Sequence, residues 1–296
     1  MDRATVTATY SRRMLLRLDD GAEVEARIKG KRLKAVCGDR VEAQPLPNEP
    51  DWLITRILER RNELTRPNMR GKVEVLAANL DYLLVVAAAE PRPDWFIVDR
   101  YLCAAELMGI DAGVVFNKTD LADELPDDEL RVYRRIGYDV ELCSALQGEG
   151  LQHVGELLGG HCSIIVGQSG VGKSSIINGL IGDEVQATSE ISGKTREGRH
   201  TTVNSAMIDL PGGGTIIDSP GVRDYAPALD SSTNAALGFR EISAAAQGCR
   251  FANCQHLREP GCQVKDDVEA GAISSRRYES YRRIVNLTRQ LSNGRF

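Results

Sequence analysis

The sequence contains no long apolar segment. Its longest apolar run covers residues 83–89, far short of the roughly 20 residues that a helix needs to span a bilayer. The first residues, Met-Asp-Arg-Ala-Thr-Val-Thr, contain no hydrophobic signal core, which argues against export. We therefore expect a cytoplasmic protein that does not bind membranes, in which the seven cysteines are reduced.

Histidine is also scarce, with four residues in a chain of 296. The composition is otherwise that of a globular protein, because 42% of the residues are hydrophobic and 27% are charged. The length exceeds that of one typical domain, so two or three domains are expected.

The net charge of −5 is unevenly distributed along the chain. Residues 1–70 carry 15 Lys and Arg against 11 Asp and Glu, and residues 276–296 carry 6 against 1. The middle, residues 71–275, carries 16 against 30. Basic ends of this kind are suited to nucleic acid, although solvated surface charge would give the same pattern.

Residues 167–175 fit the pattern of a phosphate-binding loop, G-x-x-x-x-G-K-[ST]. In such a loop, backbone N–H groups surround a phosphate chain, the lysine neutralises it and the serine hydroxyl binds Mg²⁺. An apolar run precedes the loop and a helical pattern follows it, so the helix N-terminus would point at the phosphates. The predicted phosphate contacts are Gly167, Gln168, Ser169, Gly170, Val171, Gly172, Lys173, Ser174 and Ser175.

A guanine-recognition motif, Asn-Lys-Thr-Asp, follows a predicted strand at residues 113–116. Asp120 can accept hydrogen bonds from both N1–H and the exocyclic amine of guanine, which adenine cannot offer, so an adenine nucleotide is disfavoured. Asn117 would reach the other edge of the purine, and the stem of Lys118 would pack beside the ring. A Ser-Ala pair after a later strand resembles the loop that contacts the base in GTPases. The predicted base contacts are Asn117, Lys118, Thr119, Asp120, Ser144 and Ala145.

Residues for Mg²⁺ and the γ-phosphate come after the phosphate loop. Asp218 ends a predicted strand in an Asp-x-x-Gly motif, where it would hold Mg²⁺ through water, and the Gly221 N–H would face the γ-phosphate. A threonine hydroxyl, from Thr201 or Thr202, would complete the Mg²⁺ shell together with Ser174.

The order of these motifs is unusual. The base-reading motif precedes the phosphate loop, whereas in Ras-like GTPases the phosphate loop comes first. A circularly permuted GTPase domain explains this order, and it should keep the parallel sheet with helices on both faces. Permutation is tolerable because the termini of a domain usually lie close together.

The position that holds a catalytic glutamine in Ras-type GTPases is Val222, which cannot orient water. His200, beside the threonine pair, is the candidate catalytic residue because an imidazole could hold the attacking water. A solvated loop histidine or an RNA contact is the alternative.

Three cysteines and one histidine cluster near the C-terminus with the spacing Cys-x4-Cys-x-His-x5-Cys. Four such ligands suit a tetrahedral Zn²⁺, and because they close the shell they indicate one structural ion. Unrelated thiols are the alternative. The predicted zinc ligands are Cys249, Cys254, His256 and Cys262.

The two ends of the chain give weaker signals. Alternating stretches at residues 5–10, 14–18, 23–28 and 52–57 predict a small β-barrel, of OB type or SH3-like. Residues 275–293 predict a basic helix with tyrosines among its arginines. These tyrosines could pack on the zinc region or stack on RNA, with the arginines facing phosphate.

Together the motifs resemble those of the ribosome small subunit-dependent GTPase A family, RsgA or YjeQ, over the whole chain. The resemblance implies a multidomain fold: an OB-fold RNA-binding barrel over residues 1–66, a central α/β circularly permuted P-loop GTPase domain over 67–229, and a mainly helical zinc-binding domain with a basic helix over 230–296.

The resemblance also implies a function. The expected activity is GTP hydrolysis with Mg²⁺, stimulated by the small ribosomal subunit during its late maturation, and the expected partner is the ribosomal RNA of that subunit. We expect a monomer with one structural Zn²⁺. A GTP-dependent RNA-binding module, in which hydrolysis is incidental, is the alternative.

Overall fold

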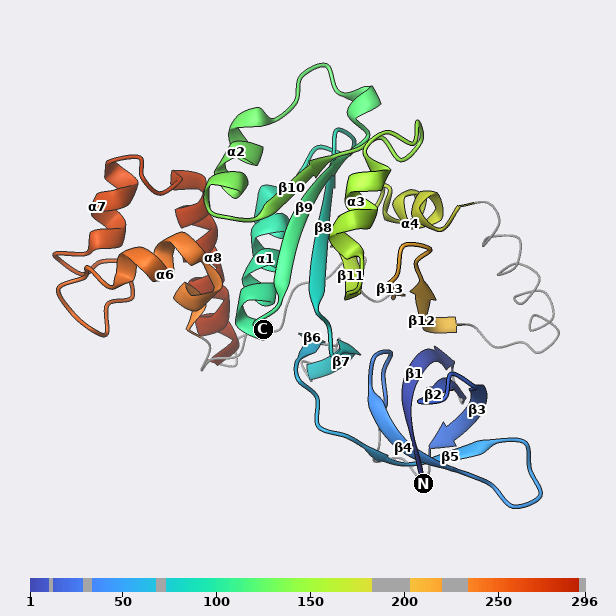
Figure 1. The fold of residues 1–296 in the computed structure, drawn as a ribbon. Helices are drawn as coiled ribbons and strands as arrows, with labels where there is room; N and C mark the ends of the chain where they lie inside the picture. Colours follow the sequence, from blue (N-terminus) through green and yellow to red (C-terminus); the bar gives the residue numbers. More distant parts are fainter. Residues whose placement is uncertain (11–12, 29–33, 68–72, 183–202, 220–233, 293–296) are drawn as a thin grey trace.

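The computed structural model describes residues 1–296 except 11–12, 29–33, 68–72, 183–202, 220–233 and 293–296. Figure 1 shows an N-terminal barrel, a central sheet flanked by helices, and a C-terminal helical region. In the described part of the chain, no helix is both long and apolar enough to cross a membrane.

The barrel has five strands in the order β1-β2-β3-β5-β4, and pairing of β1 with β4 closes it. Strands β3 and β5 are parallel, and the other pairs are antiparallel. This closed, five-stranded arrangement confirms the OB-type prediction. Alternate residues such as Val6, Leu16, Val41 and Ile54 fill the interior. The strands are β1 Asp2–Tyr10, β2 Met14–Leu18, β3 Glu23–Ile28, β4 Arg40–Pro45 and β5 Trp52–Ile57.

A two-stranded hairpin, β6 (Glu63–Pro67) and β7 (Val73–Ala78), links the barrel to the central sheet. The sequence patterns did not predict this hairpin. The Ala78 N–H donates to the Cys37 carbonyl of the barrel at 3.1 Å. The domain boundary proposed between residues 66 and 67 falls within this hairpin.

The central sheet confirms the predicted GTPase architecture. Its strands lie in the order β10-β9-β8-β11-β13-β12, and all neighbours are parallel except β12, which is antiparallel to β13. The strands are β8 Tyr82–Ala88, β9 Asp111–Asn117, β10 Asp139–Leu142, β11 Cys162–Gly167, β12 Val203–Asp209 and β13 Thr215–Asp218.

Helices cover both faces of this sheet, as the alternation along β8 requires. Leu83 and Val85 point to one face, where α1 (Trp95–Met108) and α2 (Asp127–Arg135) pack. Their neighbours Leu84 and Val86 point to the other face. Helices α3 (Leu151–Leu158) and α4 (Lys173–Ile181), the latter directly after the phosphate loop, cover that face. This layering brings the carboxyl ends of the parallel strands to one edge, where α/β proteins bind ligands.

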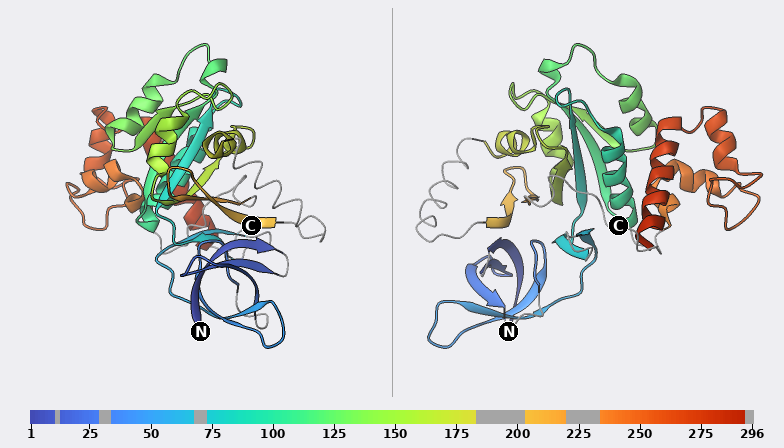
Figure 2. Two further views of the ribbon diagram at one scale, coloured as in Figure 1. Left: turned by 45° about the vertical axis from the view of Figure 1, so that its right-hand side comes forward. Right: turned by 180° about the vertical axis from the view of Figure 1, so that it is seen from behind.

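The barrel and the central sheet form one continuous sheet of eleven strands. Strand β1 pairs antiparallel with β12 at the edge of the central sheet, with Ala8 opposite Ala206. Arg17 of β2 adds two hydrogen bonds to the Asp209 carboxylate, at 2.9 and 2.7 Å. The views in Figure 2 show the barrel against this edge, while the C-terminal helices lie beyond α1.

The C-terminal region packs on α1 around its own core. Phe239, Ile242 and Ile284 are fully buried in that core, and Cys103 of α1 belongs to it. Gly238 lies directly on α1, because a Cβ there would be only 2.2 Å from the Cys103 Sγ. The described elements are η3 Ala235–Gly238, α6 Arg240–Ala246, α7 Gln263–Glu269 and α8 Ser275–Ser292.

Candidate GTP site and metal cluster

The phosphate loop runs from β11 into α4, as predicted, and two glycines permit its tight path. Gly167 has φ 141°, and a Cβ there would lie 2.2 Å from the Val86 carbonyl oxygen. Gly172 has φ 94°, and a Cβ there would lie 2.3 Å from the Asn117 Nδ2. Any larger residue would clash at both places.

The loop surrounds a cavity of about 320 Å³ at the start of α4. Lys173 extends over the loop and donates to the carbonyls of Gly167 and Gln168, at 2.8 and 2.6 Å. A lysine in this place can bind a phosphate that enters the loop. The cavity is lined by Lys118, Ser169, Gly170, Gly172, Lys173, Ser174 and Ser175.

Asn117 connects the base-reading motif to the phosphate loop. Its Nδ2 donates to the Val171 carbonyl at 2.9 Å. Its Oδ1 accepts from the Ala145 N–H at 3.0 Å and from the Cys143 thiol at 3.3 Å. The side chain is 1% exposed, so one buried amide joins three loops that are far apart in sequence.

Asp120 and Ser144 also meet, because the serine hydroxyl donates to the Asp120 carboxylate. Lys118 has φ 59°, in the left-handed region, and lines the cavity beside the phosphate loop. Burial raises the pKa of the Cys143 thiol to about 12, so this group stays a protonated donor toward Asn117. Lys118 thus borders the phosphate cavity, and Asp120, two residues later in the chain, offers a carboxylate of the kind that could recognise guanine.

Asp218 ends β13, the strand beside β11. It therefore lies at the same sheet edge as the phosphate loop. The hydroxyl of the next residue, Ser219, is 2.9 Å from that of Ser205 on β12. The remaining predicted residues, His200, Thr201, Thr202 and Gly221, lie outside the described part of the chain.

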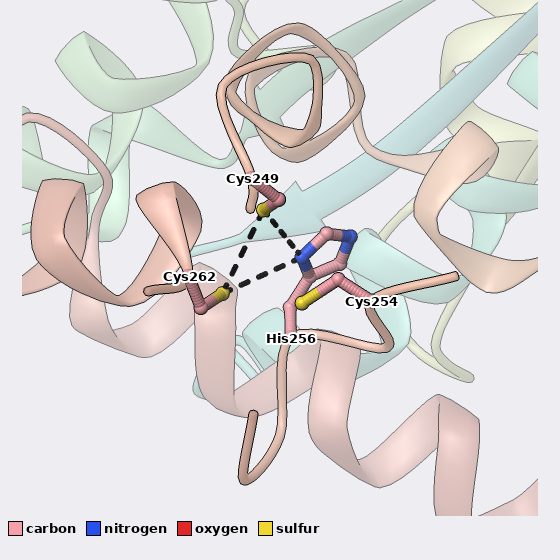
Figure 3. A group of neighbouring side chains, drawn as sticks. All are labelled: Cys249, Cys254, His256 and Cys262. Atoms are coloured by element: carbon pink, nitrogen blue, oxygen red, sulfur yellow. Dashed lines mark hydrogen bonds between the residues drawn. The ribbon is translucent and has the colours of Figure 1, made fainter. Parts of the chain in front are cut away.

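The four predicted metal ligands come together (Figure 3). The ligand atoms of Cys249, Cys254, His256 and Cys262 all lie within 4.8 Å of one another. The His256 Nδ1 is 3.5 Å from the sulfurs of both Cys249 and Cys262. Cys249 follows α6 and Cys262 precedes α7, so two helix ends and the loop between them provide the ligands.

The chemistry of this cluster fits a metal ion. Burial raises the pKa of the Cys262 thiol to about 12, so a thiolate there needs a cation beside it. Burial lowers the pKa of His256, which favours the neutral imidazole that metals bind. Three sulfurs and one ring nitrogen are the ligand set of structural zinc sites.

Two tyrosines of helix α8 donate hydrogen bonds to the segment between α6 and α7 that carries the metal cluster. The Tyr278 hydroxyl donates to the His256 carbonyl at 2.6 Å, and the Tyr281 hydroxyl donates to the Gln255 carbonyl at 2.8 Å. Tyr281 is 2% exposed. This confirms the packing alternative for the tyrosines.

The expectation that the arginines of this helix face phosphate is wrong for Arg276 and Arg277. Arg277 is 0% exposed and bonds to Asp99 of α1 and Glu241 of α6. Burial opposes its charge, but the two carboxylates keep its pKa above the ordinary value. Arg276 bonds to Asp99 and to Glu129 of α2. Periodicity alone could not reveal these pairs, because their partners lie more than a hundred residues away, except for Glu241.

The chain is similar to known proteins. The model of the RsgA GTPase family matches residues 57–227. The small ribosomal subunit biogenesis GTPase RsgA of Ectopseudomonas mendocina (strain ymp) is 43% identical over 257 residues, which cover 84% of this chain and 74% of that protein. The protein of the same name from Chlorobaculum tepidum is 39% identical over 295 residues, covering 93% and 94%.

Two solved structures have the same fold. YjeQ from Thermotoga maritima superposes with a TM-score of 0.74 at 29% identity, over 100% of this chain and 99% of that one. YloQ, a circularly permuted GTPase, superposes with a TM-score of 0.73 at 25% identity, over 98% and 96%. With a permuted GTPase sheet, a Cys3His cluster and these matches along its length, the chain belongs to the RsgA GTPase family.

Proposed function

We propose that this protein hydrolyses GTP during late biogenesis of the small ribosomal subunit and that the subunit stimulates this hydrolysis. The single observation that carries the proposal of a GTP site is the Asn117 side chain. It bonds to Val171 of the phosphate loop and to Ala145, and so joins the base-reading motif to the phosphate loop. The ribosomal part is supported by the relatives, which are named small ribosomal subunit biogenesis GTPases.

GTP would lie across the sheet edge with its base and phosphates on different loops. Asp120 accepts from the guanine N1–H and amine, and the stem of Lys118 packs on the ring. The phosphates lie in the cavity at the start of α4, where loop N–H groups, Lys173 and the helix dipole stabilise their charge. Gly221 would add an N–H toward the γ-phosphate.

Ser174 and Asp218 would hold Mg²⁺, with a hydroxyl from Thr201 or Thr202. Ser174 lines the phosphate cavity, and Asp218 ends β13, the strand paired with β11; both side chains offer oxygen ligands of the kind that Mg²⁺ prefers. When bound, Mg²⁺ neutralises charge that develops on the phosphate oxygens. Lys173 and the loop N–H groups neutralise the rest.

The attacking water needs a residue to orient it, and Val222 cannot do this. His200, two residues before Thr202, would hold the water through its imidazole. The isolated enzyme would then turn over slowly until its partner orders that residue. Stimulation by the subunit follows from this requirement.

The metal cluster would hold one Zn²⁺ with a structural role. Cys249, Cys254, His256 and Cys262 supply four ligands within one small volume, and four protein ligands leave no position for a reacting water. The ion would connect the end of α6 to the start of α7 and would fix the loop that α8 supports.

The barrel would contact ribosomal RNA, since residues 1–70 carry 15 Lys and Arg against 11 Asp and Glu and OB barrels bind nucleic acid. The domains would follow the limits 1–66, 67–229 and 230–296, with the hairpin of β6 and β7 connecting the first domain to the second. The protein would act as a cytoplasmic monomer that does not bind membranes.

Turnover of GTP with and without purified small subunits tests the function. We expect small subunits to raise turnover about tenfold or more, a smaller effect than the roughly 10³- to 10⁵-fold that partner-supplied groups provide in other GTPases. Large subunits at equal RNA concentration are the control and should have little effect. ATP should neither be hydrolysed nor compete for the site.

Two outcomes would count against the proposal. If small subunits bind in the presence of GTP but leave turnover unchanged, the protein is a GTP-dependent RNA-binding module with incidental hydrolysis. If large and small subunits stimulate equally, the response is to RNA in general and the small-subunit assignment fails.

A further inference from the structure

Helix α1 contacts the phosphate loop at its N-terminus. The N–H of its N-cap residue, Asp94, donates to the Gln168 Oε1 at 2.9 Å, and the Asp94 carboxylate accepts from the Phe96 N–H at 3.0 Å. Beside this contact, a Cβ at Gly170 would lie 3.6 Å from the Pro91 Cδ. The second and fourth residues of the phosphate loop therefore rest on the segment that begins α1.

The next turns of the same helix carry the ion pairs that hold the C-terminal region. Asp99 is 0% exposed and accepts from the Arg276 Nη1 at 2.6 Å, the Arg277 Nη1 at 2.9 Å and the Tyr133 hydroxyl at 2.8 Å. Arg277 also donates to both carboxylate oxygens of Glu241, at 2.8 and 3.0 Å. Asp99 lies five residues after Asp94, less than two helical turns away.

Buried ion pairs of this kind restrict orientation. A charge that has left water is stable only while its partners keep their geometry, so a displacement of α8 would leave Asp99 or Arg277 uncompensated. Farther along α1, the Glu106 carboxylate accepts a hydrogen bond from the Nε of Arg240 in α6 at 2.7 Å. Arg240 also donates to the Gly137 carbonyl at 2.6 Å. The C-terminal region therefore restrains α1 in addition to the packing of that helix on the central sheet.

We propose that Gln168 is a positioning residue through which the C-terminal region, acting along α1, holds the phosphate loop in its nucleotide-binding geometry. The Gln168 side chain points to Asp94, while its carbonyl accepts from Lys173 at 2.6 Å. One residue thus connects α1 to the lysine of the loop. Nucleotide affinity then depends on contacts of α8 that never touch the nucleotide.

This inference rests on the proposed GTP site, and a double-mutant cycle tests it. The variants are Gln168→Met, which keeps the side-chain length but lacks the acceptor, Arg276→Met, and the two combined. Arg276 is preferred to Arg277 because its side chain is 23% exposed, so its loss is less disruptive. Arg282→Met is the matched control, since that α8 arginine pairs only with Glu279 among the described residues and is 51% exposed.

We expect Gln168→Met to raise the dissociation constant of a fluorescent GDP analogue about fivefold, the effect of one ordinary hydrogen bond. Arg276→Met should raise this dissociation constant about twofold to fivefold in the wild-type chain. In the Gln168→Met chain it should raise the constant less than about twofold, because the hydrogen bond between Gln168 and Asp94 is already absent. Arg282→Met should leave it unchanged. Amide exchange at the loop should be faster in Arg276→Met.

Three results would overturn the inference. The first is that the double variant raises the dissociation constant by the product of the two single-variant fold-changes, which would mean that Gln168 and Arg276 act independently. The second is that Arg276→Met, folded by circular dichroism, binds as the wild type does with unchanged amide exchange. The third is that Arg282→Met has the same effect as Arg276→Met. Loss of GDP binding in Lys173→Ala is measured in parallel, so failure of the GTP site itself would be recognised separately.

Discussion

Replacing Arg277 by methionine should strongly destabilise the junction between α1, α6 and α8. The guanidinium is 0% exposed and makes three hydrogen bonds of 2.8 to 3.0 Å to Asp99 and Glu241. Methionine fills most of the volume but removes the charge. Asp99 would keep Arg276 and the Tyr133 hydroxyl, whereas Glu241 would lose its one ion pair among the described residues.

The expected cost is about 3 kcal/mol, the low end of the range for breaking a buried pair, because only one carboxylate is left without a cation. With a urea m-value of about 3 kcal/mol/M, the unfolding midpoint should fall by about 1 M. Trp95 of α1 provides the signal, since its ring lies 5.9 Å from that of Tyr133. A Trp52→Phe background removes the other tryptophan.

Two further variants make this measurement decisive. Combining Arg277→Met with Glu241→Leu should recover part of the loss, because the unpaired carboxylate is removed as well. Arg282→Met should cost less than about 0.5 kcal/mol, since its pair with Glu279 is exposed. If Arg277→Met is as stable as Arg282→Met, the buried pairs do not hold this junction.

Three other predictions follow from the site. Asn117→Ala should raise the dissociation constant of GTP about 10²-fold, because three hydrogen bonds are lost and their partners on two other loops are left unpaired; calorimetry showing unchanged affinity would contradict this. Chelation should release one Zn²⁺ per chain, as measured by mass spectrometry, and should lower the helix content measured by circular dichroism. A chain that stays fully folded without the ion would exclude the structural role. His200→Ala should cut subunit-stimulated turnover by about 10²-fold and leave GTP affinity intact; unchanged stimulated turnover would remove the residue from the mechanism.

Local patterns were sufficient to predict the GTPase sheet and the metal cluster. Strands Met14–Leu18, Glu23–Ile28 and Trp52–Ile57 have the predicted limits, and α8 begins at its predicted first residue, Ser275. The Cys3His cluster forms as its spacing indicated. These features depend on residues close in sequence, where hydrophobic period and ligand spacing are informative.

The long-range features could not be predicted from such patterns. The pairing of Ala8 with Ala206 joins strands almost two hundred residues apart and depends on an edge that only the folded sheet exposes. The basic pattern of α8 suggested contact with phosphate, but Arg276 and Arg277 bind buried carboxylates instead. The sequence alone does not distinguish a solvent-exposed arginine from one that forms a buried ion pair with a carboxylate distant in sequence.

Residues 117–120 and 167–175 should hold opposite ends of one guanine nucleotide. Asp120→Asn tests it directly, because asparagine can donate to the C2 carbonyl of xanthine but cannot accept both donors of guanine. Competition binding should show Asp120→Asn preferring XTP to GTP, and Lys173→Ala binding neither. If Asp120→Asn keeps the preference for GTP, the two loops do not hold the same ligand.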